Sequence, residues 1–325
     1  MSGRSLPDSQ GAPERLAIVG PTASGKSAVA LAIARCLRGS EADPGGGAEI
    51  VSVDSMQVYR EMDIGTDKPS ALVRAEVPHH LVDVADPSED YSLTRFQEAA
   101  RQALADIADR GRVAVLVGGT GLYHRAVIDD LDIPGRFPAT VAELENEPDT
   151  PALHRRLAEL DPVAATRMEP TNRRRVVRAL EVTVGSGRPF SSYGPGLGEY
   201  PPGGIAQIGL SLPRPEIDRR VEERFHRLMA DSLLAEVQAL ADRRPPLSRT
   251  ASQALGYREL LAHLRGEMSL DEAVVLAIRR TRRFARRQER WFRRDPRIVW
   301  LPADAAPEAL AEQALAHGLP RRLPT

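Results

Sequence analysis

The hydrophobic positions of this chain alternate between short continuous runs and stretches of helical spacing. Five apolar runs, most of them rich in β-branched residues, predict strands at residues 16–20, 49–54, 113–119, 206–212 and 297–301. Strands that are apolar along their whole length are typical of a parallel sheet covered on both faces. Apolar residues at helical spacing predict helices at residues 27–37, 93–109, 217–240 and 270–294. The pattern therefore predicts an α/β fold in which helices flank a parallel sheet.

The pattern changes between residues 130 and 204, where short helical segments are interrupted by many prolines and glycines. We interpret this region as a helical insertion domain within an α/β core formed by residues 15–129 and 205–301. Residues 1–14 are polar and predict a disordered N-terminus. The alanine-rich residues 302–325 predict a C-terminal tail that forms a surface helix. Residues 38–47 lengthen the link before the second strand, and we assign them no function.

Composition and charge exclude several classes of protein. With 325 residues, 42% hydrophobic and 27% charged, the chain is long enough for a substantial core, and no apolar run approaches the ~18 residues needed to cross a bilayer. The N-terminus has no apolar segment of the kind found in secretion signals, so we expect a cytoplasmic protein. The net charge of -1 predicts no nucleic-acid binding by itself, so that signal must come from clustered charge.

Cysteine and histidine usage gives no indication of a metal cluster. The single cysteine, Cys36, excludes an intrachain disulfide and a cysteine-based zinc site, and its apolar helical position predicts a small core residue. His79 and His80 precede a strand-like run without a second histidine cluster at metal-ligand spacing. We therefore interpret both histidines as structural.

A phosphate-binding motif follows the first predicted strand and precedes the first predicted helix. Residues 20–27 read GPTASGKS, which fits the spacing G-x-x-x-x-G-K-[ST] of P-loop NTPases. In such a loop, backbone N–H groups and the helix N-terminus surround phosphate oxygens. Lys26, one of only two lysines in the chain, supplies a compact positive charge, and the Ser27 hydroxyl can ligate Mg²⁺. The predicted phosphate-binding residues are Gly20, Pro21, Thr22, Ala23, Ser24, Gly25, Lys26 and Ser27.

The strand at residues 113–119 argues against a nucleotide hydrolase. Hydrolases with this loop normally hold Mg²⁺ with an acidic residue at the end of such a strand. Here the strand ends in Gly118-Gly119-Thr120, without a carboxylate. The remaining prediction is chemistry on a small phosphorylated or diphosphorylated ligand, with an acidic residue supplied from elsewhere.

Asp54, which follows the second strand, is a candidate for that acidic residue. Ligands of doubly wound sheets lie beyond the carboxyl ends of the strands, so Asp54 should face the same crevice as the phosphate loop. There it could act as a general base or bind Mg²⁺ through water. Asp54 could equally be a capping or loop aspartate with Ser55 and Gln57 as partners. Spacing alone does not decide between these readings.

Seven segments together carry a resemblance to a known family. They follow one another as GPTASGKS, SVDSMQVYREMDIGTDKP, PHHLVDVADPSEDYSLTRFQ, LVGGTGLY, RALEV, ALGYRE and RRQERWFRR. In this order the chain resembles the bacterial tRNA dimethylallyltransferase family from residue 16 to residue 301. The resemblance implies transfer of a dimethylallyl group from dimethylallyl diphosphate to N6 of adenosine 37, next to the tRNA anticodon, with release of diphosphate.

The resemblance also implies roles for individual residues. It makes Asp54 the acceptor of the N6 proton and places the Thr120 hydroxyl near the oxygen that bridges the allylic carbon to the diphosphate. Thr120 also fits the N-cap of the segment that follows it, and the two roles are compatible because capping orients the side chain. Arg258 resembles an arginine that binds the diphosphate, a task for which a bidentate guanidinium is suited, although it could also be a solvated helix residue. Mg²⁺ on Ser27 is the implied cofactor.

Two clusters of arginine predict contact with RNA. One lies at residues 173–178, and the other, at residues 279–294, holds nine arginines against the single acidic residue Glu289. Helical spacing separates a basic stripe from an apolar stripe containing Phe284 and Trp291, so we predict that the basic stripe contacts phosphates. To be modified, the target base must leave the anticodon-loop stack. The resemblance implies tRNA contacts from Asp54, Ser55, Met56, Gln57, Thr120, Arg174, Arg175, Arg178, Gln253, Gly256, Tyr257, Arg258, Arg286, Arg287, Arg290 and Arg293, with the insertion closing over the anticodon stem-loop.

Three other functions remain open at this point. A small-molecule kinase would use the same loop and Asp54 but has no need of two arginine clusters. An isopentenyltransferase acting on free adenine nucleotides would share the catalytic core and would not bind an anticodon stem-loop. A non-catalytic RNA-binding module would leave Lys26, Asp54 and Thr120 without a shared purpose. We expect a monomer.

Overall fold

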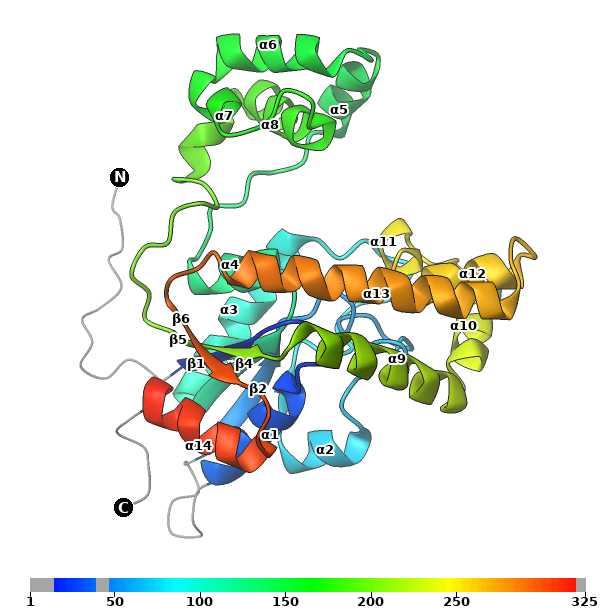
Figure 1. Ribbon diagram of the computed structural model, residues 1–325. Coiled ribbons are helices and arrows are strands. Elements are labelled where there is room, and N and C mark those ends of the chain that lie inside the picture. The colour runs from blue at the N-terminus through cyan, green and yellow to red at the C-terminus, as the bar shows by residue number, and fades with distance from the viewer. Residues whose placement is uncertain (1–14, 39–46, 320–325) are drawn as a thin grey trace. The chain divides into compact units, whose positions relative to one another are not determined.

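A six-stranded parallel sheet forms the centre of the larger of two units of the chain (Figure 1). The computed structural model describes residues 15–38 and 47–319. The strand order is β3-β2-β4-β1-β5-β6, and every neighbouring pair is parallel. The strands are β1 (Arg15–Val19), β2 (Ala48–Ser52), β3 (His79–His80), β4 (Val113–Gly118), β5 (Ala206–Ser211) and β6 (Ile298–Pro302). The α/β fold and the five predicted strands are confirmed, and the histidine pair itself forms the sixth strand.

Alternation along the strands sends apolar side chains to both faces of the sheet. Leu16 and Ile18 of β1 pack on one face, whereas Ala17 packs on the other. The first face is covered by α1 (Lys26–Cys36) and α14 (Pro307–Gly318). The second is covered by a larger set of helices, which includes α3 (Leu93–Asp109), α4 (Gly121–Ile128), α9 (Arg214–Ala230), α10 (Leu233–Asp242), α11 (Arg249–Ser252), α12 (Tyr257–Leu264) and α13 (Leu270–Phe292). A sheet covered on both faces explains the continuous apolar runs.

Three expectations from the sequence are wrong. The helix predicted at residues 217–240 is interrupted at Ser232, whose φ of 75° is left-handed, so α9 and α10 are separate. Residues 302–319 do not form a surface tail, because Leu310 and Leu315 of α14 are buried in the core that α14 shares with α1 and β5. Cys36 is exposed near the end of α1 rather than in the core. The predictions for residues 1–14 and for most of the link at 38–47 lie outside the described residues.

The second unit, Asp129–Pro201, has a hydrophobic core of its own. Its core is built from Leu144, Leu153, Leu157 and Leu180 together with smaller apolar residues. Its elements are α5 (Pro138–Glu145), α6 (Thr150–Leu160), α7 (Pro162–Thr166), α8 (Arg173–Ser186) and the short 3₁₀ helix η1 (Phe190–Tyr193). All secondary-structure elements described in this unit are therefore helices, as the sequence pattern of residues 130–204 predicts.

The remaining helix of the larger unit is α2 (Ala71–Glu76), which precedes β3. Within residues 15–38 and 47–319, none of the helices combines the length and the apolar character needed to cross a membrane.

A buried ion-pair network stabilises the sheet at β2. The Glu49 side chain is only 2% exposed and accepts hydrogen bonds from Arg110 at 2.8 Å, Arg112 at 2.9 Å and His80 at 2.5 Å. Burial alone would raise the pKa of this carboxyl, but the two guanidinium groups and the imidazole lower it to about 2. The folded state therefore favours ionised Glu49 more strongly than the unfolded state does.

We expect Glu49→Gln to lower the free energy of unfolding by about 3 kcal/mol at pH 7, because the change removes the one negative charge that faces two guanidinium groups and turns an acceptor into a donor beside them. Because the folded-state pKa is lowered, this contribution is complete above about pH 4.5 and is lost as the pH falls toward 2. Urea unfolding of the variant and the parent across that range measures the difference. Glu76→Gln is the control, since it removes a more exposed pair with Arg35 and should change the stability little. A constant difference down to pH 2 would contradict this assignment.

Candidate active site

Three adjacent strands bring the predicted site residues to one edge of the sheet. The phosphate loop follows β1, Thr120 follows β4 and Asp54 follows β2, and these strands lie in the order β2-β4-β1. Because the strands are parallel, their carboxyl ends share one edge. A Cβ atom on Gly118 would lie 2.0 Å from the carbonyl oxygen of Val53, so glycine allows the chains that leave β4 and β2 to approach closely.

The phosphate loop has the backbone conformation that its glycines permit. Gly20 and Gly25 have φ values of 144° and 89°, which side chains rarely adopt, and Gly25 is the N-cap of α1. A Cβ atom on Gly20 would also lie 2.7 Å from the carbonyl oxygen of Leu210 on β5. The loop therefore turns tightly into the N-terminus of a helix, the arrangement that directs backbone N–H groups at an anion.

Lys26 is held inside the loop in an electrostatically unusual position. Its Nζ donates a hydrogen bond to the carbonyl oxygen of Pro21 at 2.6 Å. Burial and the neighbouring positive charge of Arg224 lower the pKa of Lys26 to about 7, while the Asp54 carboxylate acts in the opposite direction. The Ser24 hydroxyl is buried and has no hydrogen-bond partner among the described residues. A bound phosphate would stabilise the Lys26 ammonium and supply the acceptor that Ser24 lacks.

The surroundings of Ser27 fit a magnesium ion carried by a phosphate ligand. The described residues contain no group of three or more histidine, cysteine or acidic side chains that could enclose a metal. Magnesium does not require such a cage, because it is commonly bound by one or two protein oxygens, phosphate oxygens and water. Ser27 is exposed in the first turn of α1, and the charge of Asp54 acts on its neighbour Lys26.

Asp54 and Thr120 are linked through the backbone N–H groups of the two residues that follow Asp54. The Oδ1 atom of Asp54 accepts a hydrogen bond from the N–H of Met56 at 2.8 Å, and the Thr120 hydroxyl accepts one from the N–H of Ser55 at 3.3 Å. Oδ2 of Asp54 makes no hydrogen bond within the part of the chain that the structure describes. The Asp54 carboxylate thus has both a loop-capping contact and a free oxygen. The Thr120 hydroxyl faces Ser55 rather than serving as an N-cap for α4.

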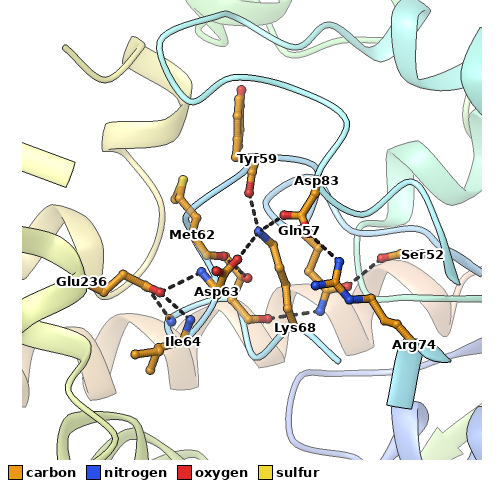
Figure 2. Close-up of polar contacts among 12 residues, drawn as sticks. Ser52, Gln57, Tyr59, Met62, Asp63, Ile64, Lys68, Arg74, Asp83 and Glu236 are labelled. Atoms are coloured by element: carbon orange, nitrogen blue, oxygen red, sulfur yellow. Dashed lines mark hydrogen bonds and ion pairs between the residues drawn. The ribbon is translucent and has the colours of Figure 1, made fainter. Parts of the chain in front are cut away.

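The segment after Asp54 is fixed by a network around the second lysine, Lys68 (Figure 2). The Lys68 side chain is 3% exposed, and its ammonium contacts the carbonyl oxygen of Tyr59 at 2.5 Å, Asp63 at 2.7 Å and Asp83 at 2.6 Å. Arg74 adds a second contact to Asp83 at 2.6 Å. All three hydrogens of the ammonium are therefore engaged, and they tie Tyr59, Asp63 and Asp83 together.

Gln57 belongs to the same network, which limits the RNA contact predicted for it. Its Oε1 accepts a hydrogen bond from Ser52 at 2.8 Å (Figure 2). Its Nε2 donates to the carbonyl oxygens of Thr66 and Asp67 at 3.2 and 3.3 Å. Both ends of the amide are used inside the protein.

Glu236 of α10 completes the network and connects it to Tyr257 of α12. It accepts hydrogen bonds from the backbone N–H groups at residues 63–65 and from the hydroxyl of Tyr257 at 2.6 Å. Tyr257 is completely buried, and Gly256 is buried beside it. Both residues therefore have a structural role in this fold, and the tRNA contacts expected for them stay a prediction.

Arg258 and Gln253 lie in a different place from the phosphate loop. Both are exposed and line a cavity of about 300 Å³ between α11, α12 and α13, together with Arg265 and Arg280. Within the described residues Arg258 makes no hydrogen bond or ion pair with the loop. The structure therefore brings together the loop, Asp54 and Thr120, but does not bring Arg258 to them.

Helix α13 is more strongly ion-paired than its own sequence predicts. Arg280 pairs with the buried Glu259 of α12, and Arg282 pairs with Glu222 of α9 at 2.6 Å. A third pair, Arg293 with Glu289, is long at 3.8 Å. The acidic partners come mainly from other helices, which a local count of charges misses. The exposed arginines of α13 without an acidic partner among the described residues are Arg279, Arg283, Arg286, Arg287 and Arg290, and Arg294 just after the helix is another.

The arginines of α8 divide in the same way. Arg178 pairs with Glu181 at 2.7 Å and donates to the carbonyl oxygens of Pro134 and Gly135, so it stabilises its own unit. Arg174 and Arg175 are exposed.

Sequence reasoning missed three residues of this site: Arg224, Gln288 and Tyr123. Arg224 of α9 donates to the Thr22 hydroxyl at 3.0 Å, and Gln288 of α13 accepts from the Thr22 N–H at 2.9 Å. Tyr123 packs against Phe96, with ring centroids 4.5 Å apart, and burial with the nearby Asp54 carboxylate and two other tyrosines raises its pKa to about 12. Gln288 lies within the quoted segment RRQERWFRR, but only the arginines of that segment drew attention.

The fold and the site together define a class of protein. A glycine-rich phosphate loop opens the sheet, the strand that would carry a hydrolase carboxylate ends in Thr120, and an aspartate stands at the neighbouring strand. This is a P-loop α/β transferase site for a phosphorylated ligand rather than a hydrolase site.

Comparison with known proteins identifies the family within that class. The sequence pattern of the family described as "IPP transferase" matches residues 57–295. A tRNA dimethylallyltransferase of Kineococcus radiotolerans is 49% identical over 89% of this chain and 90% of its own length, and one of Thermobifida fusca is 48% identical over 89% and 90%. The crystal structure of a tRNA isopentenylpyrophosphate transferase from Bacillus halodurans is 36% identical, covers 95% of this chain and 97% of its own, and superposes with a TM-score of 0.67. The chain belongs to the IPP transferase family.

Proposed function

We infer that this chain is a tRNA dimethylallyltransferase, which transfers the dimethylallyl group of dimethylallyl diphosphate to N6 of adenosine 37 beside the anticodon. The observation that carries this inference is the meeting of the phosphate loop, Asp54 and Thr120 at one sheet edge, in a chain of this family. All three parts come from one chain, so we propose that a single copy holds a complete site.

The phosphate loop would bind the diphosphate of the donor. The backbone of residues 20–27, the Lys26 ammonium and the otherwise unpartnered Ser24 hydroxyl would surround its oxygens. Magnesium, held by Ser27 and the diphosphate, would neutralise charge on the leaving group. Lys26 contributes most as the leaving group departs, because its positive charge then faces growing negative charge.

Asp54 would take the proton that the acceptor amine loses. In the reaction a bond forms between N6 and the allylic carbon, the bond from that carbon to the diphosphate oxygen breaks, and one N6 proton is released. The free Oδ2 of Asp54 can accept this proton, while Oδ1 keeps the carboxylate oriented through Met56. The product is N6-(dimethylallyl)adenosine and the leaving group is diphosphate.

Thr120 and Tyr123 would complete the surroundings of the allylic carbon. The Thr120 hydroxyl already accepts the N–H of Ser55, so its own hydrogen is free to donate to the oxygen that bridges carbon and phosphorus. The Tyr123 ring is half-buried against Phe96 and would exclude water from a carbocation-like centre.

A labelling experiment tests this function directly. The protein is incubated with Mg²⁺, labelled dimethylallyl diphosphate and an anticodon stem-loop carrying A36-A37, and the label is then located. Label on N6 of A37 is the expected result. Label on free adenine nucleotides but not on the stem-loop would indicate the related nucleotide-modifying enzyme. Stem-loop binding without transfer would indicate an RNA-binding module, and phosphoryl transfer from ATP would indicate a kinase.

The unpaired arginines of α13 would contact the RNA backbone. We expect the double change Arg286→Gln and Arg290→Gln to weaken binding of anticodon stem-loops of any sequence to a similar extent, because phosphate contacts carry no sequence information. Each lost contact should reduce the salt slope of log K by up to about one unit, and by less where the RNA is single-stranded. Dimethylallyl diphosphate affinity should stay unchanged. Binding titrations at several salt concentrations measure both quantities.

The matched control removes the same charge from arginines that already have acidic partners. Arg95→Gln with Arg219→Gln breaks exposed pairs with Glu89 and with Glu216 and Glu223. This control should keep the salt slope of the parent. Equal slopes for the parent and the α13 variant would mean that the basic stripe of α13 is only a solvated face.

A further inference from the structure

The buried side chain of Gln288 joins two segments that follow different strands. Its Oε1 accepts a hydrogen bond from the N–H of Thr22 in the phosphate loop at 2.9 Å, and its Nε2 donates to the carbonyl oxygen of Gly119 after β4 at 2.9 Å. A backbone N–H can only donate and a carbonyl can only accept, so these partners fix which end of the amide is which. Gln288 therefore bridges the phosphate loop and the turn that carries Thr120.

The glycines on either side of Thr120 are required by the approach of α13. A Cβ atom on Gly119 would lie 2.2 Å from Nε2 of Gln288, and one on Gly121 would lie 2.2 Å from the indole of Trp291. Thr120 thus stands between two positions that are each covered by a side chain of the same helix. The motif LVGGTGLY needs its glycines here for packing as well as for the turn.

These contacts continue to the carboxylate. Thr120 accepts the N–H of Ser55, the residue that follows Asp54, at 3.3 Å. The line of contacts therefore runs from the phosphate loop through Gln288 to Thr120 and on to Asp54. Arg224 of α9 donates a second hydrogen bond to Thr22, to its hydroxyl at 3.0 Å. The phosphate loop is therefore held by α9 and α13 as well as by β1 and α1, which flank it.

We propose that Gln288 is a positioning residue, which sets the spacing between the phosphate loop and Thr120 with Asp54. The proposal rests on the proposed function and deepens it. Gln288 acts through the backbone of Thr22 and Gly119 and takes no part in the bond changes. Helix α13 therefore has two roles: its outer face carries the unpaired arginines, and its inner side holds the reacting groups at the right spacing. Misplacement of such groups by about 1 Å can lower a rate by about 10²-fold.

Two substitutions separate the hydrogen bonds from simple packing. Gln288→Met removes both hydrogen bonds at similar volume. Gln288→Glu keeps an acceptor for the Thr22 N–H but turns the donor that faces the Gly119 carbonyl into a second acceptor. For both variants we expect the single-turnover rate at saturating donor and stem-loop to fall by about 10- to 100-fold. The stem-loop Kd should not change, because the amide is buried on the inner side of α13.

Gln238→Met is the matched control, since Gln238 is an exposed glutamine of α10 that donates a hydrogen bond to Asp242 of the same helix. It should keep the parent rate. A double-mutant cycle tests the same contact from the Gly119 side. Gly119→Ala must displace the Gln288 amide, so the effects of Gly119→Ala and Gln288→Ala on the rate should not be additive. This cycle remains informative if one substitution at 288 fails to fold.

Two results would overturn the proposal. One is a parent rate in folded Gln288→Met and Gln288→Glu. The other is a fall in rate that disappears at saturating stem-loop, which would mean that Gln288 only docks the RNA-binding helix. A parent protein that transfers no dimethylallyl group contradicts the proposed function instead. Calorimetry with Mg²⁺ and inorganic diphosphate then still tests Gln288, because its Met variant should bind diphosphate more weakly than the parent and Gln238→Met should not.

Discussion

Asp54→Ala lowers the single-turnover rate of dimethylallyl transfer by roughly 10²–10⁴-fold, the usual size of a general-base contribution, and leaves stem-loop binding nearly intact. The reason is the place of the carboxylate: it stands after β2, acts electrostatically on Lys26 and has one oxygen free of internal hydrogen bonds within the described chain. Rapid-quench measurement of labelled product, with enzyme in excess over RNA, reports this rate without a contribution from product release.

Asp54→Asn is the sharper test, because it distinguishes the two roles that the structure gives this side chain. The amide oxygen of asparagine can still accept the N–H of Met56, so the loop contact is kept. An amide cannot accept the N6 proton at neutral pH. If the general-base role is right, the asparagine variant loses as much rate as the alanine variant. A rate close to that of the parent would show that Asp54 serves only to cap its loop.

Lys26→Ala is expected to weaken donor binding and to lower the rate at saturation by about 10²–10³-fold, since the charge on the departing diphosphate grows during the reaction. Donor titrations and single-turnover rates measure the two effects separately. Lys26→Arg should be almost as poor, because a planar guanidinium cannot replace a compact ammonium bonded to the Pro21 carbonyl. Parent-like turnover of either variant would mean that the loop binds something other than the donor diphosphate.

The lowered pKa of Lys26 predicts that donor binding is accompanied by proton uptake. In the absence of ligand this pKa is lowered to about 7 by burial and by Arg224. A bound diphosphate raises it, so at pH 8 binding is accompanied by proton uptake, and donor affinity falls as the pH rises above 7. Calorimetry at pH 8 in two buffers of different ionisation enthalpy measures the uptake. Lys26→Ala should abolish this contribution, and equal uptake in the parent and the variant would assign the proton to another group.

The chain's own pattern sufficed for most of the fold. Continuous apolar runs predict a sheet covered on both faces, and the motif at residues 20–27 places a phosphate loop between a strand and a helix. Each of these signals depends on residues that are neighbours along the chain, where covalent geometry already fixes their relation. The break at Ser232 had no such local signal, and the burial of α14 depends on packing against α1 and β5.

For the site, the sequence by itself determined the phosphate loop and supplied Asp54 and Thr120 as candidates. Only the tertiary structure decided which of the candidates meet. The order of three parallel strands brings Asp54 and Thr120 to the loop, while the packing of α12 buries Tyr257 and leaves Arg258 in a separate cavity. Gln288 lies 266 residues from Thr22, and Arg224 lies 202 residues from it. Hydrogen bonds over such separations depend on how helices pack on the sheet, and spacing along the chain carries no information about that packing.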